Sequence, residues 1–84
     1  MTREEAIKML ANTKVYVDGK SREIQEKLFS LGFHWTSGSK QVLFEEKPFL
    51  FFGEDMELYY SSDMEHFTNK AFIEITANDI LNII

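Results

Sequence analysis

The stretch SREIQEKLFSLGFHW, residues 21–35, predicts a complete helix that turns directly into a strand. Ile24, Leu28 and Leu31 follow the i, i+4, i+7 spacing that places apolar side chains on one helical face. Ser21 is a suitable N-cap, because its hydroxyl can accept a hydrogen bond from a free backbone N–H of the first turn. The stretch therefore predicts an amphipathic helix that packs against a core.

The end of this helix is also marked in the sequence. Gly32 follows the last apolar position, and a left-handed glycine commonly ends a helix there. Phe33 is then placed to fold back onto the last turn as its apolar contact. We expect a helix over about 21–31 and a strand over 33–36.

Length and composition indicate a globular protein. The chain has 84 residues, 44% of them hydrophobic and 14% aromatic, which is enough for one core but not for two. We therefore expect a single domain over residues 1–84. The chain has no cysteine, which excludes disulfides and thiolate metal sites.

Two sequence features bear on localisation. The first ten residues, MTREEAIKML, carry charges where a signal peptide has its apolar region. No apolar run approaches the roughly 20 residues needed to span a bilayer. We expect a cytoplasmic protein that does not bind membranes.

Charge is distributed unevenly along the chain. Residues 1–40 contain seven Lys/Arg and five Asp/Glu, a net +2, whereas residues 41–84 contain two and nine, a net −7. A nucleic-acid-binding protein ordinarily has a basic patch or stripe, and the sequence contains no such cluster. The charge pattern disfavours direct nucleic-acid binding.

Short helices are expected at both ends of the chain. Thr2 and Glu5 form a capping box before a short apolar stripe, and Asn12 is placed to stop that helix. Thr76 and Asp79 repeat the capping pattern before the apolar C-terminus.

Between the helices, the pattern predicts several short strands. One lies at 14–17, before the Asp18-Gly19 turn. Others are expected at 41–45, 49–52, 57–61 and 71–75, with a loop or one helical turn over 61–69. Short connections favour antiparallel hairpins. The expected fold class is α+β: a mostly antiparallel sheet of about five or six short strands, with the 21–31 helix on one face.

The run Phe49-Leu50-Phe51-Phe52 is apolar on both faces of its expected strand, whereas a half-solvated strand alternates apolar and polar residues. Either a terminal helix covers the second face or a second chain does. The C-terminal helix is the favoured cover, because Ile80, Leu81 and Ile84 otherwise have nothing to pack against. This favours a monomer, or at most a weak homodimer.

Candidate interaction residues are mostly aromatic or acidic. Aromatic side chains that end in a polar group are suited to a wet binding surface. Trp35, however, is more simply interpreted as a large core residue. The two adjacent tyrosines should point to opposite faces of their strand. The candidate surface comprises His34, Trp35, Tyr59, Tyr60, Glu54, Asp55 and Glu57.

The sequence predicts no catalytic, cofactor or metal site. The Gly19-Lys20-Ser21 triplet lacks the earlier glycine of a phosphate-binding loop, since position 14 is Lys. Asp63, Glu65 and His66 cluster in a polar stretch that does not match a calcium loop. Such groups are usually solvated turns.

Residues 23–35, with the preceding strand and the later Phe-rich strand, carry a pattern of the "qekLf-lG(Y/F)-W" kind. In this the chain resembles small uncharacterised proteins of bacteriophages and bacterial mobile elements. The resemblance covers about two thirds of the chain and transfers no catalytic or ligand residue. It implies a cytoplasmic accessory protein whose activity is open.

Three functions remain after these exclusions. The favoured one is a non-enzymatic macromolecular interaction module with a protein partner. The alternative is an acidic mimic of nucleic acid that inhibits a nuclease or DNA-binding protein, because clustered carboxylates can imitate phosphates. A small-molecule binder is a third and weaker reading.

Overall fold

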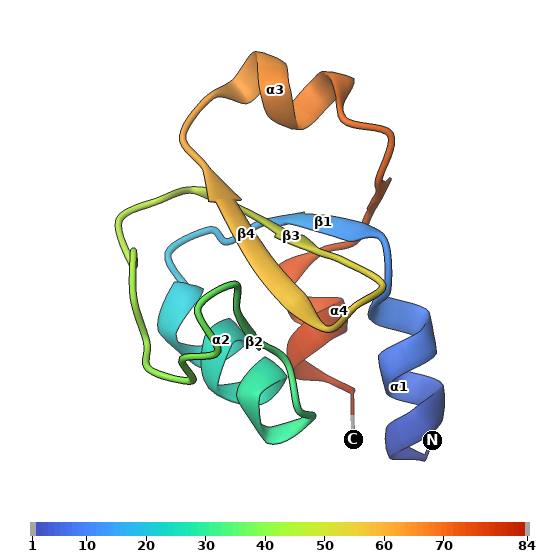
Figure 1. Cartoon of the computed structure of the whole chain (residues 1–84). Coiled ribbons are helices and arrows are strands. Elements are labelled where there is room, and N and C mark those ends of the chain that lie inside the picture. Colours follow the sequence, from blue (N-terminus) through green and yellow to red (C-terminus); the bar gives the residue numbers. More distant parts are fainter. Residues whose placement is uncertain (1, 84) are drawn as a thin grey trace.

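The computed structural model describes residues 2–83. It is an α+β fold with one sheet, three helices on one face and one helix on the other (Figure 1). In chain order the elements are α1 Arg3–Leu10, β1 Thr13–Tyr16, α2 Ser21–Ser30, β2 His34–Trp35, β3 Phe49–Phe52, β4 Glu57–Ser61, α3 Met64–Asn69, β5 Ile73–Glu74 and α4 Ala77–Leu81.

The sheet has the strand order β2-β4-β3-β1-β5 and is mixed. β3 pairs antiparallel with β1 and β4, whereas β2 pairs parallel with β4 and β5 pairs parallel with β1. The expectation of a mostly antiparallel sheet was therefore wrong. Only the β3–β4 hairpin joins sequence neighbours. Each edge strand follows a helix that crosses the sheet, and such crossovers permit parallel pairing.

The main core lies between the sheet and helices α1, α2 and α4. Ile24 and Leu28 of α2 are fully buried in this core, together with Leu50 and Phe52 of β3. Ile80 brings α4 into the same core. The other buried members are Ala6, Leu10, Val15, Val17, Leu31, Phe33, Trp35, Leu58, Ala77 and Ile83.

The second face of β3 is covered by α3. Phe49 and Phe51 are buried there against Phe67 of α3 and the half-buried Phe72 that follows it. The expectation of a covered second face is confirmed, but the C-terminal helix is not the cover. Its apolar residues pack on the opposite face instead, beside α2; Ile84, which was expected to join them, lies outside the described residues.

A buried lysine holds α3 in place. Lys14 of β1 is 6% exposed, and its Nζ donates to the carbonyl oxygens of Phe67, of Thr68 at 3.4 Å and of Lys70 at 3.1 Å. The same ammonium lies 4.8 Å from the centre of the Phe67 ring. These carbonyls belong to the end of α3, where the helix dipole also favours a cation.

The C-terminal end of α2 confirms the sequence prediction. Gly32 has φ of 104°, its N–H donates to the Phe29 carbonyl, and the Phe33 N–H donates to the Leu28 carbonyl. These two bonds form a Schellman motif. The predicted N-cap was wrong, because Lys20 occupies that position and Ser21 is the first helical residue.

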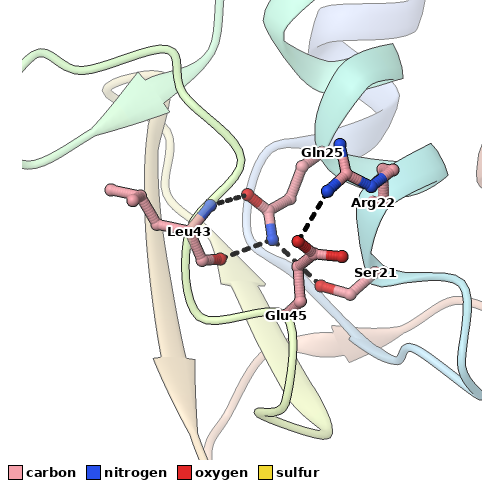
Figure 2. A network of polar contacts seen from close by, with 5 residues as sticks. All are labelled: Ser21, Arg22, Gln25, Leu43 and Glu45. Atoms are coloured by element: carbon pink, nitrogen blue, oxygen red, sulfur yellow. Dashed lines mark hydrogen bonds and ion pairs between the residues drawn. The ribbon is translucent and has the colours of Figure 1, made fainter.

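The Ser21 hydroxyl instead belongs to a buried amide network (Figure 2). It accepts a bond from Gln25 Nε2 at 2.9 Å, and the same nitrogen donates to the Leu43 carbonyl at 2.7 Å. Gln25 Oε1 accepts from the Leu43 N–H at 3.0 Å. The side-chain amide of the fully buried Gln25 thus both donates to and accepts from the backbone of Leu43, as the backbone of a paired strand residue does.

Residues 36–48 contain no helix or strand, so the strand expected at 41–45 was wrong. This segment lies against α2 instead of pairing with the sheet. The Gln25 side chain of α2 forms hydrogen bonds with the backbone N–H and carbonyl of Leu43 in this segment. The Arg22–Glu45 ion pair, 2.8 Å long, adds a second tie on the surface (Figure 2).

The remaining boundaries differ little from the predictions. Both terminal helices form with their predicted caps, since Thr2 accepts from the Glu5 N–H and Thr76 from the Asp79 N–H. The last strand is shorter than the predicted 71–75. Its Ile73 is 73% exposed rather than buried, because the chain there turns Phe72 towards the second face.

Candidate interaction site

A groove of about 620 Å³ lies on the outer face of the sheet, the face that α3 covers. It is formed by the end of β3, the turn into β4, the start of β1 and the chain around α3. The lining residues are Asn12, Phe51, Gly53, Glu54, Asp55, Tyr59, Tyr60, His66, Lys70 and Phe72.

The floor of the groove is aromatic. Phe51 of β3 pairs in register with Tyr59 of β4, so both side chains stand on the same face of the sheet. The Phe51 ring meets His66 edge-on at 5.5 Å and Phe72 edge-on at 5.7 Å. Phe51 is 2% exposed, whereas Tyr59 is 40% exposed, so Tyr59 keeps a substantial part of its surface open to solvent or to a partner.

The β3–β4 turn places a carboxylate next to this tyrosine. A Cβ on Gly53 would lie 2.6 Å from Asp55 Oδ1 and 3.3 Å from Tyr59 Cε2, so only glycine allows this approach. Asp55 Oδ1 also accepts from the Glu57 N–H at 3.2 Å. The turn thus places a carboxylate and an aromatic ring against the same bare backbone position.

The groove has a negative electrostatic character at Tyr59. Its hydroxyl donates to Glu57 Oε1 at 3.3 Å. The pKa of Tyr59 is raised above its ordinary value of 10.0, first by desolvation, then by the charge of Asp55 and by the bond to Glu57. Each of these causes disfavours a second negative charge at this position.

One cation lies across β3 from Tyr59, because Tyr59 is on β4 whereas Lys70 and Phe72 directly precede β5, on the other side of β3 in the strand order. Lys70 Nζ lies 5.4 Å from the centre of the Phe72 ring. Within residues 2–83 the Arg22–Glu45 contact is the one ion pair between side chains, so Glu54, Asp55 and Lys70 are not neutralised within that part of the chain. The groove therefore has a carboxylate end and an ammonium end.

A second aromatic group lies on the helix side of β4. Trp35 is 5% exposed and donates from Nε1 to the Gln41 carbonyl at 3.0 Å, which confirms its interpretation as a core residue. Its ring meets Phe44 and Tyr60 edge-on at 5.3 and 6.3 Å. Phe44 and Tyr60 are 39% and 40% exposed, so this cluster reaches the surface.

The structure divides the seven predicted surface residues. The groove brings together Glu54, Asp55 and Tyr59, with Glu57 bonded to Tyr59. Tyr60 borders the groove but turns its ring to the other face of β4, so the prediction that the two tyrosines point to opposite faces is confirmed. The remaining two lie on β2, the edge strand on the other side of β4, and do not line the groove. His34 is half-buried there, with Nδ1 2.8 Å from the Trp35 carbonyl oxygen.

Six lining residues escaped the sequence prediction: Asn12 and Gly53, which flank strands, and the four larger side chains Phe51, His66, Lys70 and Phe72. Pairing 49–52 with 57–61 as a hairpin would have placed Phe51 opposite Tyr59. The other three larger side chains reach the groove only because α3 folds over the outer face, and no local sequence signal indicates that.

Within residues 2–83 no three His, Asp or Glu side chains gather closely enough to hold a metal ion. None of the helices described here is both long and apolar enough to cross a bilayer. Comparison of the chain with models of protein families, with curated proteins and with solved structures finds no match.

Proposed function

We propose that this protein is a non-enzymatic interaction module that binds another protein through the outer-face groove. The resemblance to phage and mobile-element proteins implies that such a module is a cytoplasmic accessory factor. Because α3 covers Phe49 and Phe51, the strand for which a second chain was the other possible cover does not require one. We therefore propose a monomer.

The observation that carries this proposal is the composition of the groove. Tyr59 is 40% exposed in the groove beside the unneutralised carboxylates of Glu54 and Asp55, whereas the equally exposed Tyr60 turns its ring to Trp35 and Phe44 on the helix side of β4. Tyrosine is enriched at protein interfaces because its ring contributes apolar area while its hydroxyl tolerates a wet rim. A rim of one charge also selects partners and speeds their association.

The alternative is the acidic mimic, favoured by the net −7 of residues 41–84. Its carboxylates lie in separate places. Glu45 pairs with Arg22, whereas Glu54 precedes β4 and Asp63 follows it. The five residues of β4 place its two ends about 13 Å apart. A mimic would bind a basic groove over that length, and its affinity would fall steeply between 50 and 500 mM salt, about the range over which screening becomes strong.

The proposal can be tested without a known partner. A random peptide library would be selected on the wild-type protein, and the enriched peptides measured against Tyr59→Ala. Tyr16→Ala is the matched control, since Tyr16 is an exposed tyrosine of β1 that does not line the groove. We expect the Tyr59 change to weaken binding about tenfold or more, as removal of an interface tyrosine commonly does, and the Tyr16 change to have little effect.

Urea unfolding of both variants would show whether they remain folded. Amide chemical shifts should move around Gly53 and Tyr59 when a peptide binds. Enriched peptides that bind Tyr59→Ala as well as wild type, or a selection that enriches none, would contradict a protein-binding groove.

A further inference from the structure

We propose that the carboxylate end of the groove accepts an arginine side chain of the partner. This inference rests on the proposed function, because it names the chemistry of the partner at the same groove. It follows from three features of the described residues: an open tyrosine ring, carboxylates beside it, and a cation that already lies on an aromatic wall.

The first feature is the pairing of Tyr59 with Asp55. A guanidinium group is planar, stacks on aromatic faces and donates in a fork that matches a carboxylate. Tyr59 offers a 40% exposed side chain, and Gly53 allows Asp55 to lie beside that ring. An arginine that stacks on Tyr59 would therefore have a carboxylate within reach of its N–H groups.

The second feature is the unneutralised charge at this end. Neither Glu54 nor Asp55 forms an ion pair within residues 2–83. The raised pKa of Tyr59 is in keeping with the same negative potential, since the charge of Asp55 contributes to it. A cationic side chain is the complement of such a surface, whereas an anionic one would be repelled.

The third feature is Lys70 at the far end. Its ammonium lies 5.4 Å from the Phe72 ring centre, so the aromatic lining already accommodates one cation. Lys70 also limits the groove to one incoming cation, because a second positive charge at Phe72 would meet like charge. The expected ligand is a single arginine rather than a basic run.

Charge-changing substitutions at the two ends should act in opposite directions. The probes are acetylated, amidated five-residue peptides with a central Arg, citrulline or Glu between glycines, followed by amide chemical shifts. Asp55→Asn should weaken the Arg peptide about three- to tenfold, because a charged hydrogen-bond partner is lost. Lys70→Met should strengthen it about two- to threefold, because a like charge is removed while the aliphatic stem remains.

Citrulline has the shape of arginine without its charge, and we expect it to bind about tenfold more weakly or not measurably. Equal binding of the Arg and citrulline peptides would overturn the proposal. Reversed signs, with the Glu peptide favoured and weakened by Lys70→Met, would instead indicate an anionic ligand at His66 and Lys70, and would overturn it equally. Thermal midpoints of both variants would confirm that each remains folded.

The selected peptides of the preceding section separate this inference from the proposed function. Groove-binding peptides that carry arginine support both. Peptides that lose affinity on Tyr59→Ala but contain no arginine would leave the protein-binding module standing and overturn the arginine assignment.

Discussion

Replacing the buried amide of Gln25 should destabilise the fold far more than removing the surface ion pair beside it. Gln25→Met keeps the approximate volume but leaves the Leu43 N–H and carbonyl and the Ser21 hydroxyl without their partner. A buried polar group left unpaired costs about 1–3 kcal/mol. Leu43 is half-buried, so its two groups fall near the lower value, and the total loss is about 2–4 kcal/mol.

Arg22→Ala is the matched control, because Arg22 lies on the same helix and ties the same loop. Its ion pair with Glu45 joins side chains that are 56% and 46% exposed, and such pairs contribute about 0–1 kcal/mol. Unfolding in urea would be followed by the fluorescence of Trp35, the single tryptophan, which is bonded to that loop at Gln41.

With a urea dependence of about 1–2 kcal/mol per molar, the Gln25 change should lower the midpoint by about 1–4 M and the Arg22 change by less than about 1 M. Amide exchange of Leu43 in the wild type should be slow. A Gln25→Met midpoint equal to that of Arg22→Ala, or fast exchange at Leu43, would refute the network as a stabilising element.

Gly32→Val should cost about 1–2 kcal/mol or more, because φ of 104° strains a β-branched residue, and Gly32→Asn should cost less; equal urea midpoints for Gly32→Val and wild type would refute the cap. Lys14→Met should loosen α3, which hydrogen exchange would show as faster exchange confined to residues 64–70, whereas unchanged exchange would mean that the ammonium does not hold the helix. Since the pKa of Tyr59 is raised in the fold, its protonated form contributes stability below pH 10.0 that is lost as pH rises through the folded value. Tyrosinate absorbance should show one late-titrating group that is absent in Tyr59→Phe and that titrates earlier in Asp55→Asn; a wild-type curve identical to that of Asp55→Asn would refute the charge contribution.

Local signals predicted the helices well and the sheet poorly. The caps at Thr2 and Thr76 and the stop at Gly32 depend on hydrogen bonds within a few residues, so neighbouring sequence contains all that they need. The exception is Ser21, where a hydroxyl suited to a cap instead pairs with Gln25 one turn later. Both roles are local, and their relative energies depend on the loop whose Leu43 backbone Gln25 binds.

The candidate site was predicted in part for the same reason. Tyr59 and Asp55 lie four residues apart around one turn, so the sequence placed them together correctly. His66, Lys70 and Phe72 reach the groove only because α3 lies on the outer face. There Lys14 of β1 donates hydrogen bonds to the carbonyl oxygens at the end of α3. The strand pattern around Lys14 did not predict its contact with α3, since the residues that accept its hydrogen bonds lie 53 to 56 residues away.

By itself the sequence determined the α+β class, the two-faced apolar strand, the caps at Thr2 and Thr76 and the stop at Gly32, because spacing, caps and turns are properties of short segments. Only the tertiary structure decided which strands are neighbours and which helix covers which face of β3. Those choices depend on competition between surfaces of similar apolar character. The residues of α4 could have covered either face, and packing beside α2 left Phe49 and Phe51 to Phe67. The groove is a consequence of that choice, because α3 and Phe72 supply one of its walls.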